Sequence, residues 1–268
     1  MLVLVEVLET TRIALSLAFF AYASWADWKS REVSNSVWIV LAPIAFALTT
    51  VQFVLFSPEL FMNYALSFGI TSGLAIVLFY LGAFGGADAK ALMCLALALP
   101  VFPTNLLSGV VFISPLFPLT VFSNAVVLAA FTVVYALLRN ALWRIRKGSG
   151  LFAGFERESV WRKLLVLITG YKVDVTALEQ PGHVYPLEDI VAKESGEDER
   201  QLMVFPKDET QETIMARLVS AGKEGRLKDG VWVTPGLPLL IFITAGLLIA
   251  LVFGDIVWAF LQFVLLPH

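Results

Sequence analysis

The sequence is poor in the residues that most often carry metal and redox chemistry, with one cysteine and two histidines among 268 residues. The single Cys94 excludes an intrachain disulfide and any zinc site made of several cysteines. The only histidines, His183 and His268, cannot form the HExxH helix of a zinc protease. A serine hydrolase with a histidine base inside the membrane meets the same obstacle. We therefore expect neither a metal nor a cofactor.

Charge is also scarce, because only 15% of the residues are charged and the net charge is −3. Nothing in this balance favours nucleic acid as a partner. Hydrophobic residues make up 58% of the chain, and the mean hydropathy is +0.80. Several apolar runs reach the roughly 20 helical residues that cross a bilayer core of about 30 Å. A spanning backbone must satisfy its own polar groups, so the expected fold is an all-α polytopic membrane protein.

Six transmembrane helices are predicted, and the first lacks the cleavage site of a signal peptide, so we expect it to be retained. Residues 104–119 carry three breaks at proline and glycine and are interpreted as a re-entrant or interfacial connection. The expected domains are a membrane domain at 1–139, a soluble domain at 140–233 and the sixth helix at 234–268. The predicted spans are residues 8–26, 36–56, 61–83, 89–102, 120–138 and 235–266.

Most of the remaining charge lies in residues 140–233, which predict a small α+β domain inserted before the last helix. The apolar run at residues 164–169 is interpreted as a strand. Residues 209–222 have an acidic first turn and a glycine at the end, which is typical of an amphipathic helix. Residues 231–234 are interpreted as a second short strand.

Basic residues predict the orientation in the cell membrane. Lys29, Arg31, Lys90 and the basic cluster at residues 139–147 fall on one side if six spans alternate, whereas residues 57–60 and 103–119 contain no lysine or arginine. By the positive-inside rule the first set is cytoplasmic, as is the soluble domain, and both termini lie outside.

Two carboxylates stand at the predicted cytoplasmic face, Asp27 at the end of the first span and Asp88 at the start of the fourth. Two carboxyl groups at one membrane depth can share a proton, because two charges a few Å apart do not both ionise cheaply. One then acts as general base on a water while the other protonates a leaving amine. The pair is therefore a candidate active site of the aspartic protease type.

Each of these residues also has a simpler interpretation. Asp88 alone could cap the fourth helix, and Asp27 alone could be a solvated interface residue. Lys29 and Lys90 are equally explained as positive-inside residues, and the two glycines at 85 and 86 as a turn. Composition and spacing leave these alternatives open.

Three sequence pieces resemble one known family. They are Asp27 and Lys29 followed by Val33 and Asn35, GAFGGADAKAL at residues 82–92, and WVTPGLP at residues 232–238 before the long last span. With the order of the spans, they resemble the archaeal preflagellin peptidases, relatives of type IV prepilin peptidases among the GxGD aspartic membrane proteases. The resemblance implies that Asp27 and Asp88 are catalytic. It also implies removal of a short basic cytoplasmic leader, usually after glycine, from preflagellins and related precursors whose hydrophobic helix lies in the bilayer.

The chain departs from the family pattern at Ala87, because the GxGD motif reads Gly85, Gly86, Ala87, Asp88. An alanine in the third position disfavours a left-handed conformation there. The paired cysteines of many bacterial prepilin peptidases are absent, as is any extra segment for N-methylation. We therefore expect a peptidase without methyltransferase activity.

Two other functions remain as alternatives. A GxGD protease could act on other transmembrane substrates, although the Tyr-Asp motif usual for signal peptide peptidases is missing. A transporter or assembly factor could use the aspartates to bind a proton or cation. That second interpretation favours acids near the bilayer centre and repeated halves, and neither is present here.

Overall fold

The computed structural model describes residues 2–103, 114–148, 150–179, 184–192, 198–203, 210–227, 229–236 and 238–265. The chain divides into two compact units. Unit 1 contains Met1–Ala129 and Pro238–His268, and unit 2 contains Ala130–Leu237. His183, His268, Glu209 and residues 104–113 of the predicted re-entrant segment lie outside the described residues.

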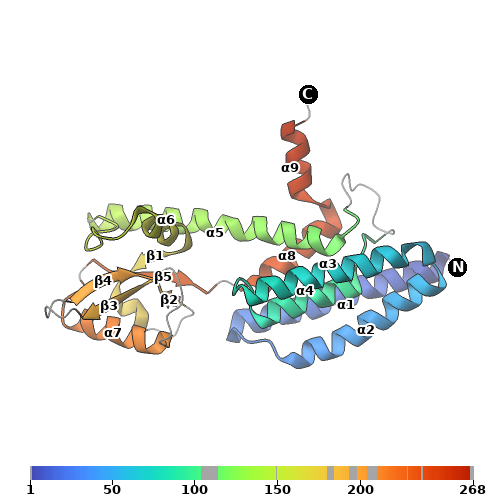
Figure 1. Ribbon diagram of the computed structural model, residues 1–268, viewed down its shortest axis with the longest axis horizontal. Helices are drawn as coiled ribbons and strands as arrows, with labels where there is room; N and C mark the ends of the chain where they lie inside the picture. Colours follow the sequence, from blue (N-terminus) through green and yellow to red (C-terminus); the bar gives the residue numbers. More distant parts are fainter. Residues whose placement is uncertain are drawn as a thin grey trace. The chain divides into compact units, whose positions relative to one another are not determined.

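Unit 1 is helical, and α5 runs on from it into unit 2 (Figure 1). A 3-10 turn, Pro58–Leu60, precedes α3. The helices are α1 (Leu2–Ser30), α2 (Asn35–Leu55), α3 (Phe61–Tyr80), α4 (Gly86–Ala98), α5 (Phe117–Lys147), α8 (Leu239–Phe253) and α9 (Ile256–Leu265).

Among the described residues, three helices are long and apolar enough to cross a membrane: α2, α3 with its preceding turn, and α5. The helices α8 and α9 are bent by 57° relative to each other, and they make a fourth candidate if the two form one broken span. The break is at Gly254, whose φ of 77° is in the left-handed region that glycine adopts readily. The chain is thus a mostly helical membrane protein, and the count of six spans stays a prediction.

The helix α4 lies at the centre of unit 1. It packs against α1, α2, α3 and α8. Its small and apolar side chains are almost completely buried in the core of this unit, among them Ala91, Leu92 and Leu95. With 13 residues α4 is about 20 Å long, too short for a bilayer core of about 30 Å. Its first residue precedes the start predicted from the sequence by three positions.

Unit 2 is built on a three-stranded antiparallel sheet of order β1-β5-β2. A separate hairpin joins β3 to β4. The helix α7 packs against this hairpin and against β2. The remaining elements are α6 (Val160–Thr169), β1 (Tyr171–Val173), a 3-10 helix η3 (Val175–Glu179), β2 (Val184–Pro186), β3 (Glu188–Ala192), β4 (Asp198–Leu202), α7 (Gln211–Lys223) and β5 (Val231–Pro235).

The sequence predictions in unit 2 were partly right. The helix α7 and the strand β5 lie where they were expected, and the α+β character is confirmed. The strand predicted at residues 164–169 was wrong, because these residues form the second half of α6. Ser159 begins this helix by accepting a hydrogen bond from the backbone N–H of Arg162 at 3.4 Å, and Gly170 ends it.

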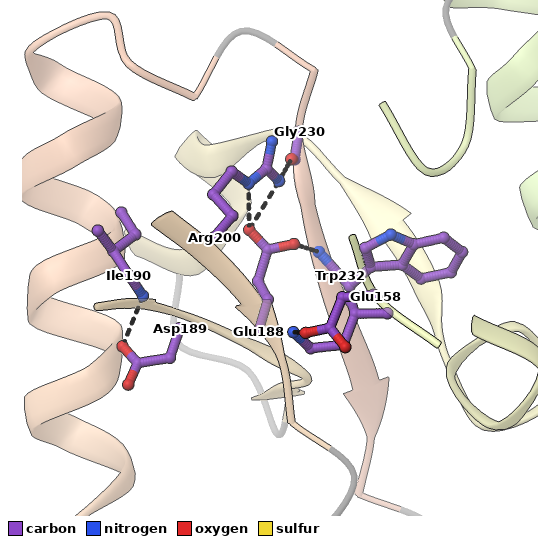
Figure 2. Close-up of polar contacts among 8 residues, drawn as sticks. Glu158, Glu188, Asp189, Ile190, Arg200, Gly230 and Trp232 are labelled. Carbon is purple, nitrogen blue, oxygen red and sulfur yellow. Dashed lines mark hydrogen bonds and ion pairs between the residues drawn. The ribbon is translucent and has the colours of Figure 1, made fainter. Parts of the chain in front are cut away.

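A buried ion pair joins the hairpin to the sheet (Figure 2). Glu188 is fully buried, and its carboxylate accepts hydrogen bonds from Arg200 at 2.7 Å and from the backbone N–H of Trp232 at 3.0 Å. Arg200 also donates to the carbonyl of Gly230 at 2.8 Å. The pair thus satisfies polar groups on β3, β4 and β5 at once, so removing either partner leaves an uncompensated charge.

Candidate active site

Asp88 lies in the first turn of α4, where the positive end of the helix dipole favours a carboxylate. Its Oδ2 atom accepts a hydrogen bond from the backbone N–H of Gly85 at 3.0 Å. Gly85, and not Asp88, is therefore the N-cap residue of the helix. Asp88 caps the helix from its third position, and its half-buried side chain is held against the chain that enters α4.

The two glycines before Asp88 differ in how much space surrounds them. A Cβ atom on Gly85 would lie 3.0 Å from Oδ2 of Asp88, which is tighter than most such contacts. A Cβ atom on Gly86 would meet only Phe79, at 3.7 Å. Gly85 has an extended backbone, so its role is the close approach of the carboxylate and not a left-handed conformation. Ala87 is helical and packs against the core, which makes the departure from glycine harmless to the backbone here.

Asp27 lies one turn before the end of α1, with a half-buried side chain. The helices α1 and α4 are in contact, and the carboxyl groups of Asp27 and Asp88 are near enough for the charge of one to act on the other. The structure therefore brings the two predicted aspartates to the same region of unit 1. A pair of interacting carboxyl groups can hold a single proton between them, which is what acid and base catalysis by one site requires.

The two predicted supporting lysines make different contacts. Lys90 is exposed, and its Nζ donates a hydrogen bond to Oδ1 of Asn35 at 2.7 Å. This bond ties the N-terminal half of α4 to the first residue of α2. Lys29 is also exposed, and its Nζ lies 5.1 Å from the ring centroid of Trp25 in a cation–π arrangement.

Arg31 is a residue near the site to which the sequence interpretation gave only a role in orientation. It follows α1 directly, and its backbone N–H donates to the carbonyl of Asp27 at 3.0 Å. Its φ is 58°, and it is the one residue other than glycine with positive φ among the described residues. Its Nε and Nη1 atoms are buried and make no hydrogen bond within the described residues. A left-handed backbone conformation is costly for a residue with a long side chain, and no sequence motif predicts it here.

A buried polar network holds the other end of α4. Arg12 of α1 donates to the carbonyl of Ala98 at 2.9 Å and to Oε1 of Gln52 at 2.7 Å. Gln52 in turn donates to Glu9 at 3.2 Å. The guanidinium thus satisfies the carbonyl of Ala98 at the C-terminus of α4 together with the hydroxyl of Thr49 at 3.3 Å, and a cation there is also favoured by the helix dipole. The helix is fixed by polar contacts at both ends.

Metal ligands do not gather anywhere in the described part of the chain. No group of three or more histidine, cysteine, aspartate or glutamate side chains is placed there to hold an ion. Cys94 is buried in α4 as a free thiol.

Two parts of the chain match known protein families. Residues 14–142 match the type IV leader peptidase family, and residues 162–256 match the archaeal peptidase A24 C-terminus type II. The two matches together cover most of the chain and include both aspartates. The chain is thus similar to the type IV leader peptidase family over its first half, and the two matches with its apolar helices support a membrane peptidase.

The similar curated proteins are preflagellin peptidases. The protein of that name from Methanococcus maripaludis strain C6 is 26% identical over 249 residues, which cover 89% of this chain and 93% of the relative. The preflagellin peptidase of Methanococcus voltae is 28% identical over 250 residues, which cover 90% of this chain and 94% of the relative. Both similarities extend over the membrane helices and unit 2.

Proposed function

We propose that this chain is an aspartic endopeptidase that removes the short basic leader from preflagellins and similar prepilin-like precursors. Two findings support the substrate class: the family match and the similarity to preflagellin peptidases over nearly the whole length of the chain. One observation supports the aspartic type. Asp27 and Asp88 come from different helices and interact through their charges, in the part of the chain that matches the peptidase family.

The proposed mechanism needs only the two carboxyl groups and a water. The ionised carboxylate takes a proton from the water as the oxygen attacks the carbonyl carbon of the scissile peptide. The protonated partner hydrogen-bonds to the carbonyl oxygen, which becomes a hydroxyl in the tetrahedral intermediate. Collapse of this intermediate breaks the C–N bond as the amine nitrogen receives a proton, and the carboxylate pair returns to its singly protonated state. No covalent enzyme intermediate forms.

The precursor would bind with its hydrophobic helix in the bilayer and its basic leader in the cytoplasm. The scissile bond then lies at the membrane surface, level with the start of α4. A glycine before that bond allows an extended backbone to approach the turn at Gly85 and Gly86 closely. We also propose that both chain termini lie outside, that Lys29 and Lys90 face the cytoplasm, and that the enzyme does not methylate its product.

A cleavage assay with the full-length protein in membranes and a glycine-containing preflagellin tests this proposal. Asp27→Asn and Asp88→Asn are each expected to abolish cleavage, since neither amide can exchange the required proton. Glu32→Gln is the matched control and is expected to retain activity. Glu32 is an exposed carboxylate close to Asp27 in the chain, in the connection between α1 and α2. Full activity in either asparagine variant would refute the dyad, and so would inhibition by a metal chelator.

A further inference from the structure

The helix α6 has an apolar face that no other part of the described structure covers. Its 10 residues contain two cations and no carboxylate. Trp161 has 75% of its surface exposed, and Leu164 has 45%. Leucine and tryptophan side chains on a water-facing domain are ordinarily at least half buried, so this exposure requires an explanation. The exposed apolar residues are Val160, Trp161, Leu164, Leu165 and Ile168.

These residues form one continuous face. At 100° per residue they fall within an arc of about 140° on the helix surface. Val166 lies on the opposite side and is buried in unit 2 with Phe155 and Trp232. Arg162 and Lys163 lie at the two borders between the exposed face and the buried side. The helix α6 thus packs on unit 2 with the side of Val166 and leaves its apolar face on the opposite side exposed.

The end of α6 is fixed at a defined position along α5. Asn140 is buried, and its side-chain amide donates to the carbonyl of Gly170 at 2.9 Å while its Oδ1 accepts from the backbone N–H of Lys172 at 3.1 Å. Gly170 directly follows α6. One side chain therefore ties the C-terminal end of α6 to α5, and all of these residues belong to unit 2.

That position on α5 is the end of its apolar part. Residues 117–138 contain no charged side chain, and Arg139 is the first. These 22 residues are enough for the roughly 20 that cross the hydrocarbon core, so Asn140 falls at the level of the lipid headgroups. A helix about 15 Å long that ends there can lie in the interface, with its apolar face toward the acyl chains.

We propose that α6 is an interfacial helix that docks unit 2 on the lipid bilayer, with the face of Val160, Trp161, Leu164, Leu165 and Ile168 immersed at the headgroup boundary. A strongly amphipathic helix with tryptophan and leucine on one side and cations beside them is the type of segment that binds there. Lys163 lies at the border of this face, where its Nζ donates to the carbonyl of Glu156 at 3.4 Å, and its charge attracts anionic headgroups. This inference does not depend on the peptidase activity or on its two aspartates.

Spin labels on the full-length protein in phosphatidylglycerol nanodiscs test the docking. In a Cys94→Ala background, a label is placed by Leu164→Cys and its collision rates with oxygen and with a water-soluble nickel chelate are compared. Phe131→Cys on α5 is the reference for lipid, and Lys223→Cys on α7 is the reference for water; both positions are exposed. The label at 164 is expected to match that at 131, with an oxygen-to-nickel ratio several-fold above that at 223. A ratio at 164 equal to that at 223 overturns the proposal.

Two further measurements separate lipid from other occupants. Dipolar broadening between labels at position 164 that disappears on dilution with unlabelled protein would mean that a second copy covers the face, and it would overturn the proposal. The charge contribution is tested by Lys163→Gln, with Lys223→Gln as the matched control. The oxygen-to-nickel ratio of the label at 164 is expected to be lower in phosphatidylcholine nanodiscs than in phosphatidylglycerol nanodiscs. Lys163→Gln should reduce this difference between the two lipids, whereas Lys223→Gln should leave it unchanged. An unchanged difference in Lys163→Gln would overturn the part assigned to anionic headgroups.

Discussion

Replacing Lys172 with methionine is expected to stabilise unit 2 at neutral pH. Lys172 lies in β1 and has only 1% of its surface exposed. Its Nζ makes no hydrogen bond within the described residues and lies 6.0 Å from the ring centroid of Trp232. Burial, and then repulsion by Arg200, lower the pKa of Lys172 from 10.5 to about 8. The folded state therefore holds this ammonium less favourably than the unfolded state does.

The size of the effect follows from that change in pKa. One pKa unit corresponds to 1.36 kcal/mol, so the charged lysine costs the folded state about 3 kcal/mol below pH 8. Between pH 8 and 10.5 the folded protein binds fewer protons at this site than the unfolded chain, so its stability rises with pH across that window. Above 10.5 the lysine is neutral in both states and the penalty is gone. Methionine fills a similar volume without a charge and removes the penalty at every pH.

Urea titration of the full-length protein in detergent, with pulse proteolysis to detect opened unit 2, measures this prediction. Lys172→Met is expected to raise the unfolding free energy by about 3 kcal/mol near pH 7 and by less than about 1 kcal/mol near pH 10. Lys223→Met is the control, because Lys223 is exposed and paired with Glu179 at 2.9 Å. The reasoning fails if Lys172→Met destabilises unit 2, or if its gain over wild type is the same at both pH values.

Three more substitutions test the packing around α4 and α8. Gly85→Ala is expected to displace the carboxylate of Asp88 by a few tenths of an ångström and to lower the cleavage rate with little change in Tm; wild-type kinetics would contradict the close approach. Gly246→Ala would place a Cβ 2.5 Å from a backbone oxygen of α5, and unfolding in detergent should show a loss of about 1–3 kcal/mol, whereas an unchanged midpoint would refute it. Arg12→Met is expected to lower the unfolding free energy by about 3–5 kcal/mol, because the buried carboxylate of Glu9 loses the compensating charge of Arg12. Adding Glu9→Gln to this variant should restore most of the loss. Equal losses in the single and double variants would show that the two charges are not coupled.

The elements that the sequence predicted well are those with a local signal. The acidic first turn of α7 and the glycine next to its last residue predict a helix without reference to the rest of the chain. The position of Asp88 at the start of α4 was likewise predictable, because glycines precede it and an apolar run follows. Its detailed role was not, because capping from the third helical position depends on the backbone path of Gly85.

The failures have a common physical cause, which is that local patterns do not report the surroundings. The apolar run at residues 164–169 has the length and composition of a buried strand, and periodicity does not distinguish this from one turn and a half of helix. The strands β1 and β2 have three residues each, too few to show an alternating pattern. The Arg12 network joins residues that are up to 86 positions apart, so no window of sequence contains it.

The strand order of unit 2 has a consequence for the time at which this protein can fold. Both β1 and β2 pair with β5, which is the central strand of the sheet and the last one to be synthesised. A nascent chain that ends before residue 231 has no partner for either outer strand, although α1 to α5 have already left the ribosome. The sheet is completed only after β5 has been made, so the maturation of unit 2 must wait until the chain has been translated to the start of α8.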